Sequence, residues 1–197
     1  MSLKKALLSV VASSVLLVPA VANASFLDGL SLRGGFYHGV NSEVRDVIDF
    51  AAWGGGLEYK IVRFPQLLNG ESWATTLSVD FHYSERGSTI VRVLPVSINQ
   101  IFTFEEQGAI TPYAGFCVTA MLIGGSDRYV APTQLVSSRN GMNNGWHQPM
   151  ITRWGAGLIL GVNFARNLFL ETRYEWIDGE DLAASPEGFR TYLGYRF

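Results

Sequence analysis

The clearest regularity of this chain is an alternation of apolar and polar residues at its C-terminus. Phe189 and Phe197 share one parity, whereas Arg190 falls on the other. The preceding segment, residues 168–176, alternates in the same way, with glutamate and arginine on its polar parity. Successive side chains of a β-strand point to opposite faces. A period of two therefore predicts strands with one apolar and one polar face.

Six earlier segments follow this rule less cleanly, so we predict eight strands in total. Their lengths fit strands that cross a membrane at a tilt, for which about 9–11 residues suffice. Long and short connections alternate between most of them, as in outer-membrane barrels whose termini face the periplasm. The six segments are 30–38, 51–64, 72–84, 89–102, 110–123 and 150–164, and the long connections are 39–50, 124–149 and 178–188.

The segment 89–102 breaks its own alternation. Val91 and Val93 share one parity, but Val96 and Ile98 share the other. Proline cannot donate a hydrogen bond to a sheet ladder and is found at edges or bulges. We therefore predict a β-bulge near Pro95.

The two faces differ in a way that separates a membrane barrel from a soluble sandwich. The apolar face is bulky and carries no charge at mid-strand, where a lysine or arginine facing lipid costs about 2–4 kcal/mol. The other face combines glycine with charge, as expected of an eight-stranded barrel, whose interior is just wide enough for side chains. We expect a packed ion-pair network there, with an ion pathway as the alternative. The predicted inward charges are Glu58, Lys60, Asp80, Arg92, Arg153, Glu171, Arg173, Glu175 and Arg190, with His82 beside them.

Aromatic residues gather at the strand ends, as in the girdles that mark the two lipid–water interfaces of such barrels. One predicted girdle contains Phe36, Trp53, Tyr83, Trp154, Trp176 and Phe189, and the other contains Trp73, Phe102, Phe164 and Phe197.

Composition and the N-terminus complete this picture. Charged residues make up 16 % of the chain, against about 25 % in ordinary soluble domains. The net charge of −2 offers no basic stripe for nucleic acid, so we predict no such partner. Lys4 and Lys5, the apolar run 6–18 and the small residues at 22–24 have the form of a secretory signal peptide. We therefore predict cleavage after residue 24, an all-β transmembrane up-and-down barrel over 25–197, and location in the bacterial outer membrane.

Several short motifs, in their order along the chain, resemble the outer-membrane β-barrel domain family, the PorT-like and OmpX-like group. The matching stretches are Tyr83–Ser88, Leu94–Val96, Thr111–Gly115, Gly157–Val162, Asn167–Tyr174 and Leu193–Phe197. The resemblance implies a barrel fold and an outer-membrane location, and it implies no single activity. The final Phe197 is similar to the signal read by the barrel insertion machinery, which the resemblance implies as a partner together with outer-membrane lipopolysaccharide.

Candidate chemistry is sparse. His82 and Ser84 are residue types that can serve as a base and a nucleophile, as in lipid A deacylases of the PagL type. However, they share the predicted inward face, whereas a lipid substrate is reached from outside. The three histidines, His38, His82 and His147, lie on separate elements, so we expect no metal site and no cofactor.

The longest connection, 124–149, is the remaining candidate. Loops of this length are often functional or disordered, and an exposed tryptophan among asparagines and glycines suits a surface partner. Its candidate binding residues are Asp127, Arg128, Trp146 and His147. We therefore expect a non-enzymatic barrel that acts through extracellular loops or supports the envelope, with a narrow pore or a lipid A hydrolase as alternatives.

Overall fold

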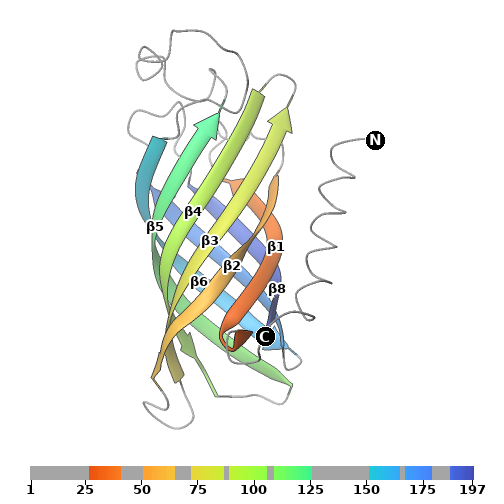
Figure 1. Cartoon of the computed structure of the whole chain (residues 1–197), viewed down its shortest axis with the longest axis vertical. Coiled ribbons are helices and arrows are strands. Elements are labelled where there is room, and N and C mark those ends of the chain that lie inside the picture. Colours follow the sequence, from red (N-terminus) through yellow and green to blue (C-terminus); the bar gives the residue numbers. More distant parts are fainter. Residues whose placement is uncertain are drawn as a thin grey trace.

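A computed structural model of the chain describes eight strands that close into an antiparallel barrel (Figure 1). Each strand pairs with the next along the chain, and β8 closes the barrel against β1. This confirms the predicted fold class. The described residues are 27–40, 51–64, 72–86, 89–105, 109–125, 151–164, 167–178 and 187–197. The strands are β1 (Leu30–Gly39), β2 (Ala52–Phe64), β3 (Ser72–Arg86), β4 (Thr89–Thr103), β5 (Ile110–Gly125), β6 (Ile151–Phe164), β7 (Leu168–Ile177) and β8 (Gly188–Arg196).

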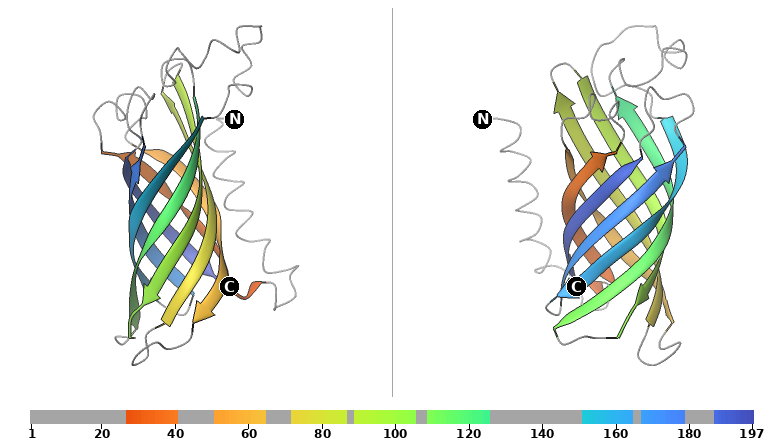
Figure 2. Two further views of the ribbon diagram at one scale, coloured as in Figure 1. Left: turned by 90° about the vertical axis from the view of Figure 1, so that its left-hand side faces the viewer. Right: turned by 180° about the vertical axis from the view of Figure 1, so that it is seen from behind.

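The barrel has two distinct ends. The beginning of β1 and the C-terminal Phe197 lie at one end, which we call the termini end (Figure 2). The opposite end, where β1 finishes at Gly39 and β3 at Arg86, is called the loop end. No helix among the described residues is long and apolar enough to cross a membrane.

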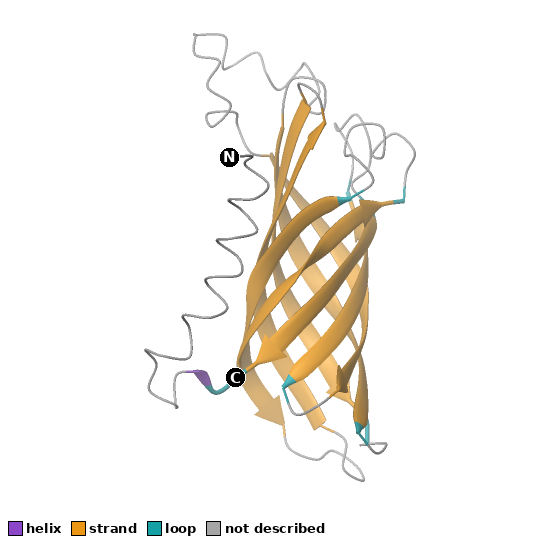
Figure 3. Ribbon diagram, turned by 90° about the vertical axis from the view of Figure 1, so that its right-hand side faces the viewer, coloured by secondary structure: helices purple, strands orange, loops and turns teal. Residues whose placement is uncertain are grey.

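Strand length is uneven around the barrel. β3, β4 and β5 contain 15, 15 and 16 residues, whereas β1 and β7 contain 10 and β8 contains 9. Pairing between β2 and β3 reaches Trp53 and Tyr83 at the loop end, while β3 and β4 stay paired as far as Arg86 and Thr89. The wall formed by β3, β4 and β5 therefore stands higher than the β1 side at the loop end (Figure 3).

The predicted bulge near Pro95 is wrong. The register of β4 against β5 is unbroken, with Pro95 opposite Met121. The β3–β4 ladder skips two positions on each strand, among them Pro95, which lacks an N–H, but resumes in the same register. Val91 and Val93 are buried on the same face as Pro95, because they pack in an apolar cluster with Met121 and Ile123 inside the lumen. The register shift in the described strands lies instead in β2, between Lys60 and Val62.

Compared with a soluble protein, the distribution is reversed: apolar side chains cover the outer surface and charged side chains are buried in the lumen. On the outer surface, Trp154 and Leu160 are each 65 % exposed. On the inner surface, Arg33, Glu171 and Arg173 are at most 2 % exposed. Since soluble domains rarely bury arginine or glutamate, or expose contiguous apolar patches, this outer surface suits a hydrocarbon environment.

Aromatic rings contact one another near both ends of the barrel. At the loop end, the ring centroids of Phe36 and Trp53 are 5.7 Å apart. At the termini end, the ring centroid of Trp73 lies 4.9 Å from that of Phe102 and 6.0 Å from that of Phe64. These contacts hold members of the two predicted girdles at opposite ends of the barrel.

Close packing inside the barrel leads to a first prediction. A Cβ atom at Gly161 would lie 2.2 Å from the Tyr113 ring, whereas the nearest atom to a Cβ at the outward Gly34 is 3.9 Å away. We expect Gly161→Ala to lower the free energy of unfolding by about 1–3 kcal/mol through overpacking. Gly34→Ala, the matched control, should leave it nearly unchanged. Urea unfolding in detergent micelles measures both, and equal effects would contradict the packing described here.

Candidate functional site: the charged lumen

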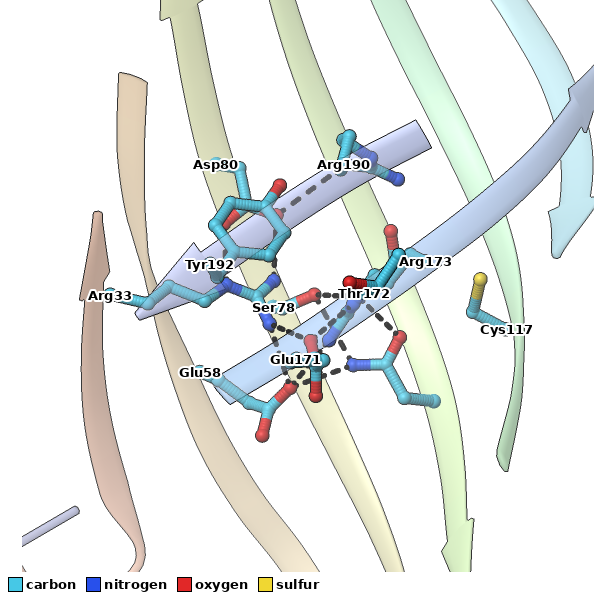
Figure 4. A network of polar contacts seen from close by, with 12 residues as sticks. Arg33, Glu58, Ser78, Asp80, Cys117, Glu171, Thr172, Arg173, Arg190 and Tyr192 are labelled. Carbon is cyan, nitrogen blue, oxygen red and sulfur yellow. Dashed lines mark hydrogen bonds and ion pairs between the residues drawn. The ribbon is translucent and has the colours of Figure 1, made fainter. Parts of the chain in front are cut away.

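Arg33 of β1 is the centre of a buried network that crosses the lumen (Figure 4). Its guanidinium makes two parallel hydrogen bonds to Asp80 of β3, from Nε to Oδ1 at 2.7 Å and from Nη2 to Oδ2 at 2.6 Å. Its Nη1 also donates to Glu171 at 3.0 Å and to Glu58 at 3.2 Å. One arginine thus connects strands on opposite sides of the barrel. Bidentate arginine–carboxylate pairs are among the stronger side-chain hydrogen bonds.

A second arginine, Arg173 of β7, completes the same layer. Its Nε donates to Glu171 Oε1 at 2.6 Å, and its Nη2 donates to Glu58 Oε2 at 2.8 Å. Its Nη1 donates to Asn99 Oδ1 at 3.0 Å. Glu58 and Glu171 are therefore each shared between two guanidinium groups.

Arg190 of β8 extends the network toward the loop end. It forms ion pairs with Glu175 and, at 3.5 Å, with Asp80. Glu175 also accepts a hydrogen bond from Thr119 at 2.9 Å and one from the Cys117 thiol at 3.3 Å. Arg190 lies directly opposite Arg173 in the β7–β8 register. Like charges at such positions repel each other, and here each arginine has its own pair of carboxylates, Glu58 and Glu171 for Arg173 and Asp80 and Glu175 for Arg190.

Glycines on the inner face make room for these side chains. A Cβ at Gly56 would lie 2.1 Å from Asp80 Oδ1, the oxygen that Arg33 binds. A Cβ at Gly194 would lie 2.2 Å from the ring of Phe169. The mixture of glycine and charge on one parity is therefore the packing requirement of a narrow, filled barrel.

Apolar clusters flank the charged layer. Two buried groups are present among the described residues, one toward the loop end and one toward the termini end. The loop-end cluster contains Tyr37, Ala52, Val91, Val93, Met121, Ile123 and Ile177, and the second contains Ile101, Tyr113, Cys117, Ile159 and Phe169. Tyr113 joins the second cluster to the network, because its hydroxyl donates to Glu171 at 3.0 Å. Side chains thus fill the central lumen.

The nine predicted lumen charges do not all join this network. Six of them do: Glu58, Asp80, Glu171, Arg173, Glu175 and Arg190. Lys60 lies on the inner face near the termini end, and Arg153 lies on the inner parity opposite Met121 of the loop-end cluster. The inward placement of Arg92 is wrong: it lies on the outer face opposite Tyr83, because the alternation of β4 continues through Pro95.

Arg33 was the residue missing from the predicted set. It is the charged residue within 30–38 and shares its parity with Tyr37, which is the signal that identifies it as inward. What the sequence does not show is that its four hydrogen bonds reach carboxylates 25, 47 and 138 residues away.

The candidate catalytic pair faces the lumen. His82 and Ser84 are 0 % and 6 % exposed, and His82 Nε2 lies 3.0 Å from the hydroxyl of Tyr192. The described residues contain no cluster of three potential metal ligands. Residues 1–24, with the predicted signal peptide, and Asp127, Arg128, Trp146 and His147 lie outside the described residues.

Comparison with known proteins supports the fold. No protein-family model matches the chain, and no curated protein matches it. Among solved structures, the outer membrane enzyme PagL aligns with a TM-score of 0.51 at 9 % identity, covering 85 % of this chain and 98 % of that one. Neisserial surface protein A aligns with a TM-score of 0.48 at 14 % identity, covering 85 % and 94 % of the two chains. The resemblance to the PorT-like and OmpX-like group stays a prediction.

The shared carboxylates predict a large cost for removing one arginine. Arg33→Met removes both hydrogen bonds to Asp80 and leaves it the ion pair with Arg190 at 3.5 Å, so the free energy of unfolding should fall by about 3–5 kcal/mol. Arg63→Met, at an exposed position of β2, should change it by about 0.5 kcal/mol or less. Adding Asp80→Asn to Arg33→Met should restore part of the loss, as a double-mutant cycle in detergent would show. Equal stabilities of the two single variants would refute the role given to Arg33.

Proposed function

We propose that this protein is a non-enzymatic β-barrel of the bacterial outer membrane, with a filled lumen and an activity exerted at the cell surface or in support of the envelope. The buried network around Arg33 is the observation that carries the proposal. It closes the lumen with paired charges instead of leaving a water-filled path. We therefore infer that the protein acts through its outer surface or through the two ends of the barrel.

The outer surface supports the proposed location. Large apolar side chains such as Leu158, Leu160 and Leu193 are 55–65 % exposed along the barrel wall, and aromatic contacts lie near both ends. Bulky apolar residues facing out between aromatic girdles suit a lipid bilayer. In the proposed orientation the termini end faces the periplasm, where the predicted signal peptide 1–24 would be removed. Lipopolysaccharide would surround the loop end, and Phe197 would serve the insertion machinery.

The loop end supports a role in surface interaction. The wall of β3, β4 and β5 continues past the last pair of β2 with β3, so it would project from the membrane on the extracellular side. The connection between β5 and β6 begins at this wall and contains Asp127, Arg128, Trp146 and His147. We keep these four residues as the candidate contact set for a surface partner.

The enzymatic alternative lacks a reachable pair in the described barrel. His82 and Ser84 are enclosed, and the histidine contacts Tyr192 on the inner face. A lipid A acyl chain approaches from the hydrocarbon outside the wall. The structural similarity between this chain and PagL comes with 9 % sequence identity and therefore concerns the fold alone. We therefore propose no hydrolase activity.

Planar-bilayer recording separates a filled barrel from a narrow pore. We expect the purified, folded protein to give no steady conductance, because ion pairs and apolar side chains occupy the central lumen. A variant that removes both central arginines, Arg33→Ala with Arg173→Ala, serves as the opened comparison if it still folds. Steady conductance of the unmodified protein, at a level that follows salt concentration, would refute the filled lumen.

Deletion of residues 126–147 tests the surface role. The deletion lies between β5 and β6 and spares every described strand, so the barrel should fold and insert as before. Adhesion of bacteria that display the protein, to host cells or to one another, should fall to the level of bacteria without it. A matched deletion within 179–186 controls for loop shortening in general. Unchanged adhesion with a folded, surface-displayed deletion variant would exclude this loop as the contact.

A further inference from the structure

A cavity lined mostly by polar and charged residues opens at the termini end of the lumen, below the charged network. Its volume is about 190 Å³, enough for about six water molecules at ~30 Å³ each. It is lined by Gly29, by inward side chains of β1 to β4 and by residues near the ends of β6 and β8. It therefore lies between the packed centre of the barrel and the mouth through which the lumen meets solvent.

Positive charge dominates this cavity. Lys60, Arg63 and Arg196 line it, and the sole acidic group of the lining is Glu58. The Oε2 atom of Glu58 already accepts hydrogen bonds from Arg33 and Arg173 of the central network. Among the described residues, no carboxylate forms an ion pair with any of the three lining cations. Arg196 and Arg63 both lie close enough to Lys60 to repel it, and this repulsion is stronger than the attraction of Lys60 by Asp28 and Glu58.

Side chains hold the guanidinium of Arg196 in place, and a backbone contact fixes the position of Lys60 on its strand. The Arg196 guanidinium donates to Asn163 Oδ1 at 2.5 Å and lies over the rings of Phe169 and Tyr113, at 4.7 and 5.1 Å. The Lys60 backbone donates to the carbonyl of Gly29 at 2.9 Å. Gly29 has a φ of 100°, and a Cβ there would press on the Lys60 side chain at 3.2 Å. Three like charges line one cavity, an arrangement that an anion stabilises.

We propose that this cavity binds a phosphate group. Phosphate carries up to two negative charges near neutral pH and offers several strong acceptor oxygens. Lys60, Arg63 and Arg196 supply the charge, and the hydroxyls of Ser31 and Thr76, which also line the cavity, supply neutral donors. The volume accommodates one such group with a few water molecules. A free phosphate and the phosphate of an anionic lipid headgroup share this chemistry.

The site belongs to the barrel itself and does not depend on the proposed surface role. Its position at the periplasmic mouth follows from the proposed orientation, whereas binding follows from the cavity alone. Failure of one proposal therefore leaves the other standing, since phosphate binding is measured on the purified protein without reference to orientation.

The test is nuclear magnetic resonance of the full barrel with two phosphate sources. Inorganic phosphate is titrated at constant ionic strength into protein in maltoside micelles, and phosphatidylglycerol nanodiscs are compared with phosphatidylcholine nanodiscs. We expect saturable shifts of the backbone amides of Ser31, Lys60 and Thr76 with at least one source. Lys60→Gln and Arg63→Gln should each weaken binding about tenfold, as expected for loss of a charge-assisted contact. Arg92→Gln removes an outward cation near the loop end and should bind like the unmodified protein.

The outcomes distinguish the two phosphate sources from each other and also test whether the cavity binds phosphate at all. Shifts with inorganic phosphate identify a soluble phosphate ligand, and shifts confined to phosphatidylglycerol nanodiscs identify a lipid headgroup. Retained strand dispersion in the spectra shows that each variant is folded. Absence of saturable shifts with both sources would overturn the proposal. Equal affinity of Lys60→Gln, Arg63→Gln and the unmodified protein would overturn it as well.

Discussion

The pairing of Arg33 with buried carboxylates is the interaction on which the rest of this barrel depends. Its guanidinium contacts Asp80, Glu58 and Glu171, which come from three different strands. An unpaired charge in such an enclosed space costs several kcal/mol. The network is therefore favourable only when the strands are in register and the barrel is closed. The charged lumen specifies the closed fold in addition to filling it.

This constraint accounts for the other residues of the inner face. Gly56 and Gly194 leave space that the network and Phe169 occupy. Ser78 and Asn99 add neutral hydrogen bonds to the ion pairs. Among the described residues, three arginines and four carboxylates meet in this layer. The narrow interior thus sets both where charge is needed and where a side chain must be absent.

The lumen changes character from one end to the other, and the proposals follow from that change. Apolar side chains around Met121 pack toward the loop end, ion pairs occupy the centre, and a cationic cavity faces the termini end. A barrel closed in this way acts at its ends. In the proposed orientation, the high wall of β3 to β5 faces outward from the cell and the phosphate-binding cavity faces the periplasm.

The sequence alone determined the number of strands, their approximate limits and the face that each parity occupies, because alternation records which side chains lipid and lumen accept. It misplaced Arg92, since a proline that interrupts the ladder without shifting the register resembles a bulge. Tertiary structure decided which inward side chains contact one another. Arg33 binds Glu171, which lies 138 residues away in the sequence, and Lys60, Arg63 and Arg196 line one cavity. Periodicity assigns a side chain to a face, whereas closure of the barrel decides which residues of that face meet.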